Sequence, residues 1–105
     1  QYRAEKVRTR ELREQIELEV RLALDAVRSA EAQIKVAEEG LSLSENELAQ
    51  AQRRYEAGVT FGLEVTDAQA RLERARENRT EALYNYNLAR IDLEQSMGRV
   101  RESVQ

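Results

Sequence analysis

Large apolar residues recur every seven positions along most of the chain, and small residues follow at a second position of the same repeat. With the repeat lettered a to g, the a positions before residue 58 hold Val20, Val27, Ile34, Leu41, Leu48 and Tyr55. The d positions there hold Ile16, Ala23, Ala30, Ala37, Ser44 and Ala51. After residue 62, the a positions hold Val65, Leu72, Arg79, Tyr86, Leu93 and Val100, and the d positions hold Ala68, Ala75, Ala82, Ala89 and Ser96. A strict heptad predicts helices that bury a narrow seam in a left-handed coiled coil.

The repeat has one clear break, at Gly58-Val59-Thr60-Phe61-Gly62. Gly58 suits a helix C-terminus that needs a positive φ, and Thr60 suits the N-cap of the next helix. We therefore predict a long helix over residues 1–57, a turn over 58–62, and a returning helix with the C-terminal end over 63–105. The predicted fold class is all-α, a long antiparallel two-helix coiled-coil hairpin.

Two further glycines lie outside the break. Gly40 falls within a strong heptad pattern and is expected to remain helical, at a cost of about 1 kcal/mol relative to alanine. Gly98 is expected to act as a second stop, so that the returning helix ends near Met97.

Antiparallel packing sets a positions against d positions, so the numbers of paired residues should have a constant total. A total of 123 pairs one large with one small residue in each layer, for example Leu48 with Ala75, which keeps the layer volume steady. Contacts between residues whose numbers total about 116 or 130, a whole heptad away, would contradict this register. In this register Arg79 would face Ser44. Its aliphatic stem would pack along the seam while its guanidinium reaches water or Glu45, or Arg79 would act as a lone charge in the seam that fixes the register.

Composition supports long helices rather than a compact core. Charged residues make up 35% of the chain and hydrophobic residues 41%, with no Trp, Pro, Cys or His. The absence of Cys and His removes most nucleophile–base pairs and zinc sites, so we expect no enzyme, no metal and no cofactor. A net charge of −3 argues against nucleic acid as a partner. No apolar run approaches the roughly 20 residues that cross a bilayer as a helix.

Two features lie off the main seam. Glu64 and Asp67 share one face of the returning helix's first turn, where acidic residues complement the helix dipole or, repeated by symmetry, form a ring of carboxylates. Apolar residues also form a second stripe on each helix: Leu22, Val36 and Leu43 on the first, and Tyr84, Leu88 and Ile91 on the second. A third helix of the same chain or a neighbouring subunit could cover these stripes.

The residues at the bend match a known pattern. The stretch Arg54-Tyr55-Glu56-Ala57-Gly58-Val59, followed by Leu63-Glu64-Val65-Thr66-Asp67-Ala68-Gln69, resembles the helix–turn–helix tip of the TolC family of outer-membrane efflux proteins. Further matches bring the resemblance to about residues 16–98, and the Tyr86-Asn87 region is more similar to the family's C-terminal repeat than to its first.

The resemblance implies a function that periodicity cannot supply. Such proteins form trimers of the outer membrane with a long α-helical tunnel, an α-barrel, in the periplasm. Their six hairpin tips dock with the hairpins of a periplasmic adaptor, which joins the channel to an inner-membrane pump in efflux or type I secretion. The chain is therefore expected to be a segment of a longer protein. The docking tip implied here comprises Arg54, Tyr55, Gly58, Val59, Thr60, Phe61, Gly62 and Leu63.

The resemblance also implies gating roles. Tyr55 and Thr60 fall on gating positions, and Glu64 and Asp67 fall on the acidic ring of the entrance, which favours cations. The family's best-known member has an arginine at the position of Thr60, so this gate is expected to close differently.

Two other interpretations stay open from the sequence. One is the hairpin of the adaptor itself, whose tip typically carries Arg, Leu and Ser at seven-residue intervals, a pattern that is absent here. The other is a structural coiled-coil arm of a cytoplasmic protein, which gives no reason for the tip elements to occur together.

Overall fold

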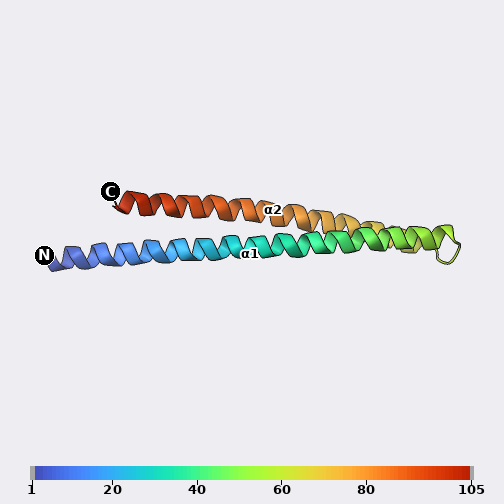
Figure 1. Cartoon of the computed structure of the whole chain (residues 1–105), viewed down its shortest axis with the longest axis horizontal. Coiled ribbons are helices and arrows are strands. Elements are labelled where there is room, and N and C mark those ends of the chain that lie inside the picture. Colours follow the sequence, from blue (N-terminus) through green and yellow to red (C-terminus); the bar gives the residue numbers. More distant parts are fainter. Residues whose placement is uncertain (1, 105) are drawn as a thin grey trace. The chain divides into compact units, whose positions relative to one another are not determined.

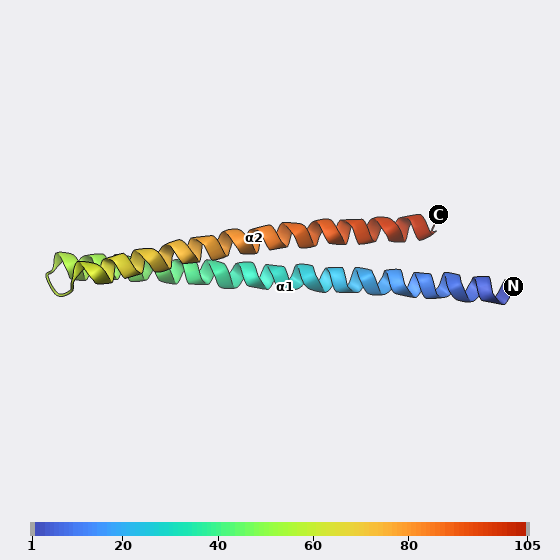
Figure 2. The ribbon, with the colours of Figure 1, turned by 180° about the vertical axis from the view of Figure 1, so that it is seen from behind.

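The computed structural model describes residues 2–104, and the side chains of residues 5–102. Helix α1 spans Tyr2–Glu56 and helix α2 spans Gly62–Val104, and the two run antiparallel from a short bend (Figure 1). The same bend is seen from behind in Figure 2. The all-α, two-helix hairpin predicted from the heptads is therefore confirmed. Gln1 and Gln105, the outer limits of the predicted division, lie outside the described residues.

The buried residues lie on the predicted seam. Every buried side chain in the described part of the chain occupies an a or d position: Ala23, Val27, Ala30 and Ala51 on α1, and Ala68, Leu72, Ala75, Ala82 and Ser96 on α2. Most of them are alanines, which let two helix backbones approach closely. Arg79 is exposed, so the charged a position interrupts the buried face of α2.

The chain divides into two compact units, one of residues 32–84 around the bend and one of residues 1–31 with 85–105. In the unit around the bend, Glu47 pairs with Arg71 at 3.4 Å and Arg54 pairs with Glu64 at 3.1 Å. All four residues occupy g positions, which flank the seam on one side.

The second unit has an ion pair of the same kind. Arg99 donates to Glu19 at 2.9 Å, and these residues are again at g positions on opposite helices. The ion pairs are exposed, so each contributes only about 0.2–1 kcal/mol. Each ion pair nevertheless shows which residues of α1 and α2 lie level with one another within its own unit.

These pairs show that the predicted register is wrong by one heptad. The residue numbers total 118 in each of the three pairs. On one helix the a residue follows the g residue by one position, and on the other helix the d residue precedes the g residue by three. Each a–d layer therefore totals two less than the adjacent g–g pair, or 116. At the bend, a Cβ on Gly62 would lie 3.6 Å from Cε2 of Tyr55, a pair that totals 117.

The error has a physical cause. Because the a residues are mostly large and the d residues mostly small, a shift of seven positions leaves one large and one small residue in every layer except that of Ile16 and Val100. Leu48, for example, is matched as well by Ala68 as by Ala75. The charges at g separate the two registers. A total of 123 would bring Arg54 level with Arg71, whereas the observed register pairs each with a glutamate. Arg79 and Ser44 total 123, so the expectation that they face each other is wrong as well.

Of the two predictions for the glycines outside the bend, the one for Gly40 is confirmed and the one for Gly98 is wrong. Gly40 is helical, as predicted. Gly98 does not stop α2, which continues to Val104. Neither residue has a positive φ, and a Cβ at either would meet no neighbour within 4 Å. A glycine ends a helix only when the chain beyond it turns away, and here the seam continues to Val100.

Candidate functional site

The tip, residues 54–67, begins with a well-defined helix end. Gly58 has a φ of 73°, the left-handed conformation predicted for it, and it is the only residue with a positive φ in the described chain. The Gly58 N–H donates to the Tyr55 carbonyl at 3.0 Å, and the Val59 N–H donates to the Arg54 carbonyl at 2.9 Å. These two bonds form a Schellman motif, which satisfies carbonyls that the end of α1 would leave unpaired.

The start of α2 differs from the prediction for Thr60. The helix begins at Gly62, so Phe61 occupies the N-cap position, and its carbonyl accepts from the Glu64 N–H at 3.1 Å. The Thr60 hydroxyl does not cap a backbone amide; it donates to the carboxylate of Glu64. The N-cap assignment of Thr60 is therefore wrong, because an acidic side chain in the first turn of α2 is within reach of its hydroxyl.

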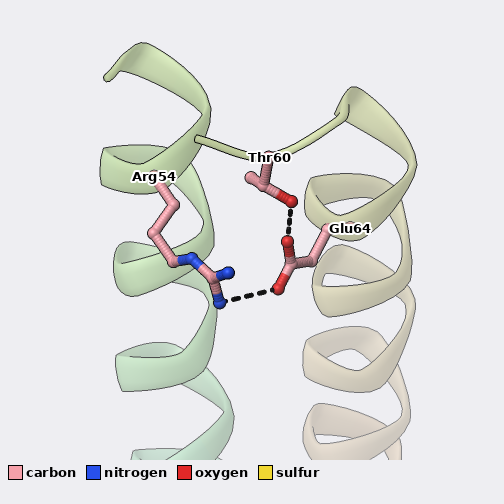
Figure 3. A network of polar contacts seen from close by, with 3 residues as sticks. All are labelled: Arg54, Thr60 and Glu64. Carbon is pink, nitrogen blue, oxygen red and sulfur yellow. Dashed lines mark hydrogen bonds and ion pairs between the residues drawn. The ribbon is translucent and has the colours of Figure 1, made fainter. Parts of the chain in front are cut away.

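One carboxylate joins the three parts of the tip (Figure 3). The Arg54 guanidinium of α1 donates through Nη1 to Oε1 of Glu64 at 3.1 Å, and the Thr60 hydroxyl of the bend donates to Oε2. Glu64 belongs to the first turn of α2, where its charge also complements the helix dipole. We call Arg54, Thr60 and Glu64 the tip network.

The second acidic residue is placed differently. Asp67 lies three positions beyond Glu64 and is exposed, and its carboxylate has no hydrogen bond or ion pair within the described part of the chain. The two residues predicted to act alike therefore differ: the Glu64 carboxylate is occupied on both oxygens, and that of Asp67 is open to solvent.

Four apolar or aromatic side chains surround the bend and face solvent. Phe61 is 85% exposed, Leu63 71%, Val59 68% and Tyr55 54%. In a Schellman motif the residue at the position of Val59 frequently packs back on the helix, but here it is left open. We call these four residues the apolar tip surface.

The tip has no feature of a metal or membrane-spanning site. Within residues 2–104, no three potential metal ligands from His, Cys, Asp and Glu lie together. Neither helix contains, over its described length, a segment long and apolar enough to cross a bilayer. What the tip offers chemically is an apolar surface, the free carboxylates of Glu56 and Asp67, and a fixed turn.

The role of Arg54 in the tip network was not predicted, although Arg54 itself was assigned to the docking tip. The signal that could have found it is the charge pattern at the g positions, where Arg54 and Glu64 are the pair nearest the bend. The pairing of Thr60 with Glu64 has no such signal, because a threonine hydroxyl serves equally as a backbone cap.

The fold and the tip define the class: an antiparallel coiled-coil hairpin with a structured, exposed turn. Residues 1–99 match the family described as outer membrane efflux protein, and the chain belongs to this family. This match confirms the predicted membership of the TolC family. The family is one of efflux-channel components of the outer membrane and not of enzymes. The adaptor hairpin and the cytoplasmic arm are excluded as identities of this chain. No curated protein and no solved structure matches the chain.

Proposed function

We propose that the chain is the periplasmic tunnel segment of an outer-membrane efflux channel, and that its tip docks with the hairpin tips of a periplasmic adaptor. The observation that carries this proposal is the apolar tip surface. Four large side chains lie exposed around a turn whose backbone is fixed by the Schellman motif. Exposed apolar side chains held on a rigid frame favour a protein partner, since little conformational freedom is lost on binding.

The partners follow from the family. Membership implies a trimeric channel with efflux partners. In the proposed assembly the chain associates as part of a homotrimer, the tip contacts the adaptor directly, and the inner-membrane pump is reached only through the adaptor. The exposed stripes support lateral neighbours: Val36 is 67% exposed and Leu43 60%, on the outer face of α1.

Gating and charge at the entrance belong to the same proposal. Tyr55 lies beside Gly62 with its ring exposed, where it is available to a neighbouring hairpin. Thr60 is proposed to act with it. Glu64 and Asp67 are proposed to form the acidic ring of the entrance, where three-fold repetition concentrates the potential of any carboxylate left unpaired.

The docking proposal is tested in the full-length channel with Phe61→Ala and Val59→Ala. We expect each to weaken site-specific cross-linking between the tip and the adaptor and to raise retention of exported compounds. Removal of a buried interface anchor typically costs about 2 kcal/mol, or roughly 30-fold in affinity.

Val7→Ala is the matched control, because Val7 is 53% exposed on α1 but lies outside the tip. It should leave cross-linking and export unchanged. Wild-type cross-linking in both tip variants would rule out docking through this surface.

A further inference from the structure

The two acidic residues at the start of α2, Glu64 and Asp67, are not equivalent. Both oxygens of the Glu64 carboxylate accept hydrogen bonds from the same chain, one from the guanidinium of Arg54 and one from the hydroxyl of Thr60. Asp67, one turn further along α2, is exposed, and its carboxylate has no polar partner in the described part of the chain. Because one carboxylate is bound within the chain and the other is open to solvent, the two residues are suited to different roles.

We infer that Glu64 is a positioning residue that fixes the docking turn, and that of the two acidic residues at the start of α2 only Asp67 presents an uncompensated carboxylate. This inference rests on the proposed docking and entrance functions, and it divides the proposed acidic entrance ring into a carboxylate paired within the chain, that of Glu64, and an unpaired one, that of Asp67.

The geometry explains how Glu64 positions the turn. Arg54 holds the bend twice: its carbonyl accepts from the Val59 N–H at 2.9 Å, and its guanidinium donates to Glu64 at 3.1 Å. Thr60 lies between Val59 and Phe61 in the chain, and its hydroxyl is bound to the same carboxylate (Figure 3). Val59 and Phe61 are two of the most exposed apolar residues of the chain. The tip network therefore holds the peptide that carries them.

The electrostatic consequence follows from the same contacts. A carboxylate paired with a guanidinium at 3.1 Å presents little net charge to a distant cation, because the two fields largely cancel. The Asp67 carboxylate has no such partner. Three copies of Asp67 around a channel entrance would then attract cations, whereas three Arg54–Glu64 pairs would contribute little.

The test uses the full-length channel with two readouts: cross-linking of the tip to the adaptor, and block of single-channel current by Mg²⁺ in a planar bilayer. The double variant Arg54→Gln/Glu64→Gln removes the ion pair without changing net charge. We expect it to reduce cross-linking at least fivefold and to leave the half-blocking Mg²⁺ concentration within twofold of wild type. Asp67→Asn should do the reverse, raising that concentration about tenfold with unchanged cross-linking.

Two further comparisons separate positioning from general loss of structure. Thr60→Val removes the hydroxyl at nearly constant shape, and Thr60→Ser keeps it, so cross-linking should fall in the first and persist in the second. The charge swap Arg54→Glu/Glu64→Arg should restore cross-linking relative to Glu64→Arg alone.

The outcomes distinguish this inference from the proposed function. If Arg54→Gln/Glu64→Gln weakens Mg²⁺ block as much as Asp67→Asn does, or leaves cross-linking intact while Phe61→Ala abolishes it, the role of Glu64 is wrong and docking stands. If Phe61→Ala also leaves cross-linking intact, docking itself fails.

Discussion

At the scale of single residues, the tip depends on one backbone conformation and one carboxylate. Gly58 is needed for its φ of 73° and not for space, because a Cβ there would meet nothing within 4 Å. A left-handed conformation costs a residue with a side chain about 1–2 kcal/mol. The other interior glycines carry no such requirement.

We therefore predict that two glycine-to-alanine changes have opposite signs. Gly58→Ala should destabilise the chain by about 1 kcal/mol through the strained φ. Gly40→Ala should stabilise it by up to about 1 kcal/mol, since Gly40 is helical with free space around it. Urea unfolding of the chain followed by circular dichroism measures both. Unchanged or increased stability of Gly58→Ala would mean that the helix end at Gly58 does not require a glycine.

The sequence was a good guide to residues whose role is set by the backbone, and a weaker one for polar side chains. A glycine in a heptad break has few alternatives, so the conformation of Gly58 was predictable. Thr60 had a choice between a backbone amide and a carboxylate, and that choice depends on where Glu64 lies once α2 begins at Gly62. Such choices are made by tertiary geometry and leave no local pattern.

At the scale of the helices, the heptads predicted the seam and failed to predict the register. Burial of a and d positions requires only the seven-residue period, which is local to each helix. Register requires a difference between layers, and here nearly every layer pairs one large with one small residue in either register. The charges at g, such as Glu47 and Arg71, supply the difference that the core lacks.

The register can be tested with introduced disulfides, because the chain contains no cysteine. Leu48→Cys combined with Ala68→Cys totals 116 and should oxidise rapidly to an intrachain disulfide, since level a and d positions bring Cα atoms within bridging distance. Leu48→Cys combined with Ala75→Cys totals 123 and should remain largely reduced. Non-reducing electrophoresis after mild oxidation distinguishes the two, and rapid closure of the second pair instead would restore the rejected register.

At the scale of the whole molecule, the chain buries a narrow seam and leaves much apolar surface in water. The buried residues are mostly alanines, while Leu22, Val36 and Leu43 on α1 are each at least 60% exposed. Two helices alone cannot cover a second apolar stripe on each of their outer faces. The family is one of outer-membrane efflux proteins, and in the assembly proposed above neighbouring hairpins would supply the missing contacts.

Lateral packing predicts a loss of assembly without a loss of fold. Val36→Lys and Leu43→Lys should leave the helix content of this chain unchanged, because both side chains are already exposed. In the full-length channel each should lower the fraction of trimer, since a lysine buried at an interface without a partner is strongly disfavoured. Ser42→Lys is the control: it adds the same charge beside Leu43 on a different face of α1. Size-exclusion chromatography of the detergent-solubilised channel measures the trimer. Full trimer yield in both stripe variants would mean that these residues face solvent in the assembled channel, and their exposure would then need another explanation.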